Sequence, residues 1–245
     1  MKKHVGVVLL LLQQGLTVPF APRPVSASSP AFNRYTYVVA TNSTVIASIT
    51  SPSILVTAND LVAVVCSAAK TALTGITASS SGSGYSWTRR SLQQYSGSPT
   101  YQQVSWAVAP ATGSFTYTCT PNTSSGYQQM MVVDFSGTGT SVETGTGGST
   151  STTTTPTSGS FSTSQRTLIL DCLSMTQGST TGTWTAGSIA GNGATLIAVN
   201  AASLSTAAQM GCEVYQATAS VSSVTAAVSN STSTRYVYDV IPVNY

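Results

Sequence analysis

Residues 145–163 read GTGGSTSTTTTPTSGSFST, a stretch almost without charged, aromatic or aliphatic side chains. It separates two strand-rich regions, so it is either a tether between two domains or a long loop inside one. A tether would join two independent sandwiches of roughly 100 residues each, which is a workable domain size. The region after the stretch has fewer strands and fewer large aromatic side chains than the region before it. We therefore expect one domain, in which halves 28–144 and 161–245 are joined by a Ser/Thr/Gly-rich surface loop, residues 145–160.

Strand patterns dominate both halves. YTYVVAT, DLVAVVCSA and QQMMVVDF lie in the first half, and RTLILDCLS, MGCEVYQA and RYVYDVIPV lie in the second. These runs are rich in Val, Ile, Thr and Tyr, and clusters of Gly, Ser, Asn and Pro separate them. No segment shows a convincing helical period. The sequence predicts an all-β chain, folded as an antiparallel β-sandwich or jelly roll.

The two halves also echo each other weakly. SPSILVTANDLVAVVCSA, from Ser51, resembles TSGSFSTSQRTLILDCLSM, from Thr157. VVDFSG likewise resembles VYDVIP, which places Asp134 opposite Asp239. An internal repeat predicts two related halves, whereas two low-complexity β halves can also align by composition alone. The two aspartates are either a symmetric carboxylate pair or two separate hydrogen-bond acceptors at strand ends.

The first residues have the pattern of a secretory leader. MKKH is a positive n-region, VGVVLLLL a short apolar region, and Val25-Ser26-Ala27 a small-residue cleavage site. We expect residues 1–27 to be a signal peptide and the mature protein to be secreted, extracellular or on the cell surface. An N-terminal arm that is not removed is the alternative. No apolar run approaches the ~20 residues of a spanning helix, so no membrane insertion is expected after cleavage.

Charged residues make up only 6% of the chain, against roughly 25% in an average soluble domain. Beyond residue 27 the basic side chains equal the acidic ones in number: Arg34, Lys70, Arg89, Arg90, Arg166 and Arg235 against Asp60, Asp134, Glu143, Asp171, Glu213 and Asp239. The mature chain is therefore near neutral. Nucleic-acid binding, which needs a basic footprint, has no support.

Enzyme chemistry is disfavoured by the residue types present. The single histidine, His4, lies in the leader, so the mature chain has none for a nucleophile system or a metal site. Phosphate-binding loops, nucleophile elbows and calcium loops are absent from the sequence. Asp171 alternates with Leu170 and Cys172, so we expect it to point to solvent. The sequence therefore predicts no enzyme, no cofactor and no catalytic, cofactor-binding or metal-ligating residue.

The four cysteines all fall on the apolar face of an alternating run: Cys66, Cys119, Cys172 and Cys212. No C-x-x-C spacing suggests zinc. In a secreted chain such cysteines favour two buried disulfides, for which three connectivities exist. One bridge per half is preferred, Cys66–Cys119 and Cys172–Cys212. Free thiols packed as small apolar groups are the alternative.

Aromatic and polar side chains could form a carbohydrate-binding face. Exposed rings on a sandwich can stack on sugars, and the candidate contacts are Trp87, Arg89, Tyr95, Tyr101 and Trp184. Trp87 lies in an alternating strand context, which instead favours a place in the core. In the binding hypothesis the partner is a surface polysaccharide.

Four segments together carry a resemblance to a known group of proteins: TANDLVAVVCSA, YSWTRR, SWAVAPATGSFTYTCT and MMVVDFSG. The chain resembles secreted Ser/Thr/Gly-rich, jelly-roll-like β-sandwich domains of surfaces and appendages in environmental bacteria and phages. The resemblance implies a fold and a location. It implies no ligand and transfers no catalytic or binding residue.

These features predict a non-enzymatic extracellular structural protein, a self-assembling or adhesive subunit of a surface layer, appendage or filament. Its partners would be copies of itself. A strand-forming N-terminal arm could complete a neighbour's sheet, through Phe32, Tyr35, Tyr37 and Val39. In a monomer the same arm would pair with the C-terminal RYVYDVIPVNY. A carbohydrate-binding module and a virion surface protein with an uncleaved leader are the alternatives.

Overall fold

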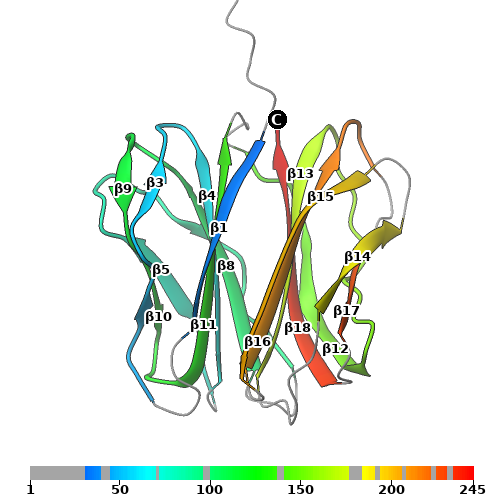
Figure 1. Ribbon diagram of the computed structural model, residues 1–245, viewed down its shortest axis with the longest axis horizontal. Helices are drawn as coiled ribbons and strands as arrows, with labels where there is room; N and C mark the ends of the chain where they lie inside the picture. Colours follow the sequence, from blue (N-terminus) through cyan, green and yellow to red (C-terminus); the bar gives the residue numbers. More distant parts are fainter. Residues whose placement is uncertain are drawn as a thin grey trace, which may run out of the picture.

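The computed structural model describes residues 31–39, 45–69, 72–95, 100–136, 141–176, 184–190, 194–205, 208–221, 225–230 and 234–245. The predicted signal peptide, residues 1–27, lies outside them. The described residues form eighteen strands (Figure 1). They include no helix long and apolar enough to cross a membrane. The predicted all-β, antiparallel sandwich architecture is confirmed.

The first large sheet has the order β1-β11-β4-β8-β6, with β7 also paired to β8. Its strands are β1 (Ala31–Val39), β4 (Leu61–Ala69), β6 (Thr88–Arg89), β7 (Gln93–Gln94), β8 (Thr100–Val108) and β11 (Gly126–Ser136). The second large sheet has the order β12-β18-β13-β16-β15. Its strands are β12 (Thr146–Thr153), β13 (Thr167–Thr176), β15 (Ala194–Ser205), β16 (Ala208–Ala217) and β18 (Thr234–Asn244).

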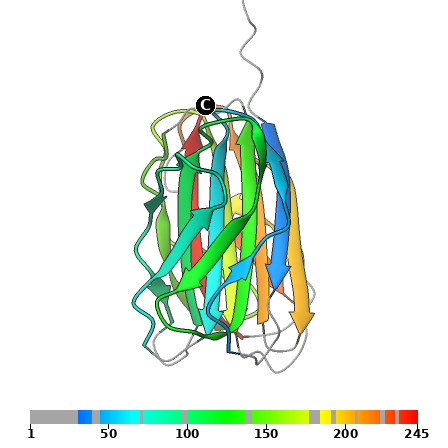
Figure 2. The same ribbon diagram turned by 90° about the vertical axis from the view of Figure 1, so that its left-hand side faces the viewer.

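Smaller sheets lie outside the two large ones. The first small sheet has the order β2-β10-β5 and is accompanied by the pair β3-β9, whereas the second small sheet is the pair β14-β17. Their strands are β2 (Ile49–Thr50), β3 (Ile54–Val56), β5 (Ile76–Ser80), β9 (Gly113–Phe115), β10 (Tyr117–Pro121), β14 (Trp184–Ala190) and β17 (Thr225–Asn230). Figures 1 and 2 show the resulting stack of layers, with the large sheets in the middle.

The two halves share one strand topology. In each large sheet, the first strand of the half pairs with the last, and the last pairs with the second: β1-β11-β4 and β12-β18-β13. In each half, one small-sheet strand follows the second strand of the large sheet and another lies between its last two strands in chain order: β5 and β10 in the first half, β14 and β17 in the second. The predicted relation between the halves therefore holds at the level of strand order.

Three apolar clusters separate the layers. One lies between the first small sheet and the first large sheet, and includes Ile49 and Val64. The second fills the space between the two large sheets, where Val65 and Phe135 meet Leu170 and others. The third lies on the other face of the second large sheet and includes Ile169. The second half thus has an outer layer of its own, and is more than a partner sheet for the first half.

Strand β4 shows why these sequences look as they do. All nine of its residues are buried, because one face packs on the first small sheet and the other on the second large sheet. A strand covered on both faces needs apolar side chains at consecutive positions rather than at alternate ones. LVAVVCSAA meets that requirement, and TLILDCLSM of β13 does so almost as fully.

Both predicted disulfides are present, Cys66–Cys119 and Cys172–Cys212. Cys66–Cys119 joins β4 to β10 and so ties two layers of the first half together. Cys172 and Cys212 are directly opposite each other on neighbouring strands of one sheet. The bridges close loops of 53 and 40 residues, each of which stabilises the fold by about 4 kcal/mol in the chain-entropy model.

The stretch expected to be a loop is largely a strand. Residues Thr146–Thr153 form β12 and pair with β18 at the edge of the second large sheet. Glycine makes this close approach possible. A Cβ at Gly145 would overlap the Val240 carbonyl, and one at Gly147 would lie 2.6 Å from an Asp239 carboxylate oxygen. The low apolar content of this stretch therefore reflects close packing against its neighbours.

We predict that Gly145→Ala destabilises the protein by about 1–3 kcal/mol, the usual cost of overpacking. The added methyl group meets backbone, which cannot move aside as a flexible side chain can. Gly75→Ala is the control, because a Cβ there would lie 3.9 Å from its nearest neighbour, Gln103 Oε1. Equilibrium unfolding in guanidinium chloride measures both variants. Equal stability of the two variants would contradict the close packing of Gly145.

Candidate functional site

A row of polar side chains crosses the inner face of the first large sheet. Ser67 lies opposite Gln129 on β11 and opposite Gln102 on β8, and all three residues are buried. The Gln102 amide donates to the Cys172 carbonyl at 3.0 Å, and the Gln129 amide donates to the Met175 carbonyl at 3.2 Å. Both carbonyls belong to β13 of the second half. These bonds fix how one large sheet sits on the other, because an apolar interface alone is not directional.

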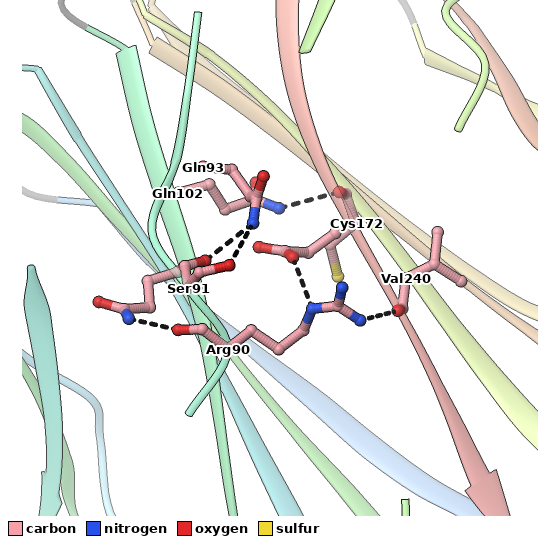
Figure 3. A network of polar contacts seen from close by, with 8 residues as sticks. Arg90, Ser91, Gln93, Gln102, Cys172 and Val240 are labelled. Carbon is pink, nitrogen blue, oxygen red and sulfur yellow. Dashed lines mark hydrogen bonds and ion pairs between the residues drawn. The ribbon is translucent and has the colours of Figure 1, made fainter. Parts of the chain in front are cut away.

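Arg90 is the charged residue among these contacts between the two halves (Figure 3). It follows β6 and reaches into the second half, where Nη1 donates to the Val240 carbonyl at 2.9 Å. Its Nε lies 3.2 Å from Asp239 Oδ1. The Arg90 side chain is 18% exposed and that of Asp239 is 0% exposed. We call the contacts of Arg90, Gln102 and Gln129 with the second half the inter-half seam.

Gln103 positions Arg90 from the opposite face of β8. Its amide nitrogen donates to the Arg90 carbonyl at 2.5 Å, and its Oε1 accepts from the Ile76 amide at 2.7 Å. The segment that carries Arg90 is therefore fixed by a buried glutamine before its guanidinium reaches Asp239.

The environment of Asp239 opposes its charged form in one way and favours it in two. Burial raises the pKa of Asp239 well above its ordinary value, while the neighbouring Arg90 guanidinium and the polar Gln102 side chain lower it. Asp134, its counterpart in the sequence echo, lies on a different interface. Burial raises the pKa of Tyr85 and Tyr117 in the outer layer of the first half, and the Asp134 carboxylate raises it further. The two aspartates therefore do not form a pair.

A second acidic group lies inside the second half. Asp171 on β13 is directly opposite Glu213 on β16, and both side chains are buried. Asp171 was expected to face solvent, and that expectation is wrong because β13 is covered on both faces. The Tyr215 hydroxyl donates a hydrogen bond to Glu213. Burial, and then the charges of Glu213 and Asp239, raise the pKa of Asp171 well above its ordinary value.

The proposed sugar-contact residues are in different situations. Trp87 is half-buried and stacks on Tyr85, with ring centroids 5.5 Å apart and planes 12° apart. Arg89 is exposed, and Tyr95 is half-buried beneath the Arg235 guanidinium. Tyr101 is only 2% exposed, so it cannot contact a glycan. The Trp184 side chain lies outside the described residues.

The N-terminal arm has a different partner from the one expected in a monomer. β1 pairs antiparallel with β11, with Tyr35 opposite Val133 and Tyr37 opposite Met131. The C-terminal strand β18 pairs with β12 and β13 instead. β1 is thus the edge strand of the first large sheet. The side chains of Phe32, Tyr35, Tyr37 and Val39 lie outside the description.

Within the described residues, no group of three or more His, Cys, Asp or Glu side chains could hold a metal ion. What the structure brings together is a seam of hydrogen bonds between halves, a buried acid pair and a stacked aromatic pair. Gln102 and Gln129 of the inter-half seam, and Gln103, which positions Arg90, carry no distinguishing sequence motif. Only the unusual glutamine content of alternating strands hints at them.

We predict that Arg90→Met costs about 3–5 kcal/mol of stability at neutral pH, because it leaves the buried Asp239 carboxylate without its cation. Removing Arg90 raises the folded-state pKa of Asp239 further above the unfolded value of about 4. The free-energy cost of burying the ionised Asp239 is then absent below that unfolded pKa and grows as the pH rises. The stability difference between Arg90→Met and the wild-type protein therefore becomes smaller toward pH 4. Chemical unfolding at both pH values measures it. The control is Arg89→Met, an exposed neighbour. A deficit of equal size at both pH values would contradict the role of the ion pair.

Compared with protein-family models, curated proteins and solved structures, the chain has no match. Its resemblance to secreted surface domains therefore stays a prediction. Function has to be inferred from the charges, contacts and sheet edges of this chain.

Proposed function

We propose that the chain is a non-enzymatic extracellular structural protein that works by self-association as a surface or appendage subunit. The observation that carries this proposal is where the charges lie. Five of the six acidic side chains beyond the leader are at most 4% exposed: Asp60, Asp134, Asp171, Glu213 and Asp239. The sixth, Glu143, is half-buried and accepts hydrogen bonds from Ser164.

Burial of the acids leaves a surface with very little charge. Among the described side chains, the exposed charges are those of Arg89, Arg166 and Arg235. Arg166 and Arg235 lie over the rings of Tyr245 and Tyr95. Most of the surface is therefore hydroxyl and backbone, and copies of the chain can approach one another with little electrostatic repulsion.

The edge strand β1 supplies a route to association. A sheet edge presents unpaired backbone donors and acceptors, to which a strand of another copy can add. β1 is long and carries a single charged residue, Arg34, which lies opposite Asp134 of β11. Edge strands that avoid pairing usually carry several charges or a proline, and β1 lacks both protections apart from that arginine.

The disulfides support the proposed extracellular location. Two disulfides are compatible with an oxidising, extracellular compartment. They support secretion, for which the leader of residues 1–27 is the sequence argument. The proposed partners are other copies of the chain.

We expect the protein, as released by its native host, to elute from size exclusion as assemblies that appear as filaments or shells by negative stain. Tyr37→Pro and Val38→Pro identify the surface involved. Successive backbone amides of β1 point alternately toward β11 and toward the free edge of the sheet. One of the two prolines therefore removes a backbone hydrogen bond between β1 and β11, and the other removes an amide at the free edge. The variant whose proline removes the free-edge amide should keep the melting temperature of the monomer and lose assembly. A wild-type protein that is monomeric at all concentrations would overturn the proposal.

A carbohydrate-binding function is the second candidate, and the stacked pair Tyr85–Trp87 favours it. A half-exposed ring of fixed orientation can stack on a sugar ring with little loss of conformational entropy. We predict that Trp87→Ala reduces retention on insoluble surface polysaccharide about five- to 150-fold, the loss of one stacking contact of about 1–3 kcal/mol. Leu55→Ala, at an exposed apolar position on β3, is the control. Unchanged retention of the Trp87 variant would exclude this site.

A further inference from the structure

The outer face of the second large sheet carries two carboxyl groups in an apolar setting. Asp171 is 0% exposed and Glu213 is 1% exposed. They occupy directly opposite positions on β13 and β16, where side chains of neighbouring strands touch. Around them lie Ile169, Leu173, Met175, Phe161 and Val221. Two ionised carboxylates cannot share such a place without a large cost in electrostatic free energy.

Among the described side chains, no cation lies beside Asp171 on this face of the sheet. β14 (WTAGSIA), β17 (TAAVSN), β12 and β15 contain no ionisable residue. On the same face, the other titratable groups are the tyrosines Tyr215, Tyr236 and Tyr238, and burial raises the pKa of Tyr236 to about 12, so its hydroxyl stays neutral. The arginines of the second half, Arg166 and Arg235, are exposed and lie over the half-buried rings of Tyr245 and Tyr95. Asp239, with its partner Arg90, is on the opposite face of the sheet.

The hydrogen bonds assign the proton. Glu213 accepts from the Tyr215 hydroxyl, a contact that suits a carboxylate. Neither oxygen of Asp171 accepts a hydrogen bond from a described residue. A buried carboxylate without donors is the costlier of the two to ionise. Asp171 is therefore the protonated member of the pair and Glu213 the acceptor.

We propose that Asp171 keeps its proton beside Glu213 in the folded protein, and that this buried acid makes the second half of the molecule most stable in acid and weakens it as the pH rises. In the unfolded chain both groups ionise near pH 4. Above that pH, unfolding releases the proton that the folded pair retains. The unfolding constant should then rise up to tenfold for each pH unit until the pair ionises in the folded state. The first half has no such opposed pair of acids among its described residues.

Unfolding constants of the full chain between pH 4 and pH 8 test this proposal, with Asp171→Asn as the informative variant. Asparagine keeps the shape of the side chain and cannot ionise, so unfolding of the variant should release one proton fewer. Its unfolding constant should therefore rise about tenfold less per pH unit than that of the wild-type protein. The variant should also be the more stable protein at pH 8. Ser174→Ala is the control, because Ser174 is a buried residue of the same strand that does not ionise in this pH range, and it should keep the wild-type slope. Equal slopes for wild type and Asp171→Asn would overturn the proposal.

Hydrogen exchange of the wild-type protein gives an independent outcome if Asp171→Asn does not fold. After correction for intrinsic exchange, the amides of β13 and β16 should lose protection from pH 5 to pH 8 relative to those of β4 and β11. Glu213→Gln should reduce that loss without abolishing it, because burial, the larger cause of the raised Asp171 pKa, remains. Parallel changes in both halves, or increased protection of β13 at high pH, would show that the acid pair does not control the second half.

Discussion

The structure depends on burying both faces of two large sheets. Once the first large sheet packs face to face against the second, β4 and β13 have no contact with water, and every polar group between them must find a partner in the protein. Gln102 and Gln129 meet this requirement by donating to carbonyls of β13, and Arg90 by binding Asp239 and the Val240 carbonyl. The apolar area drives the association, while these bonds define its register.

The two halves use one topology and stabilise it differently. In the first half, Cys66–Cys119 crosses between layers, so the outer sheet is covalently tied to the inner one. In the second half, Cys172–Cys212 stays within one sheet and faces the other half. The second small sheet has no such covalent tie to the sheet beneath it. The buried acids Asp171 and Glu213 lie on the face of that sheet opposite the seam. Sensitivity to pH is therefore expected in the half whose outer layer has no disulfide to the sheet beneath it.

Sequence reasoning succeeded where a pattern depends on neighbours along the chain. Alternation predicted the strands and the inward direction of the cysteines, and with them the preferred disulfides. It failed for Asp171 and Tyr101, because alternation implies a solvent face and the large sheets have none. It also failed for Gly145 and Gly147. Glycine is needed there because Val240 and Asp239, about ninety residues later in the chain, leave no room for a Cβ. The sequence similarity between the halves predicted the shared strand order, but aligned residues lie on different faces of their sheets. Cys66 faces the small sheet, whereas Cys172 faces the seam.

The scarcity of charge has a single physical origin in this architecture. A stack in which the large sheets are covered on both faces leaves few positions where a charge is cheap, and the acids that remain lie inside with hydrogen-bonding or electrostatic roles. Burying Asp239 and the Asp171–Glu213 pair costs stability, whereas apolar residues there would pack without that cost. Such groups persist where they fix register or respond to their surroundings. Asp239 does the first, through Arg90. The Asp171–Glu213 pair, which lies on the face of the sheet opposite the seam, is suited to responding to its surroundings.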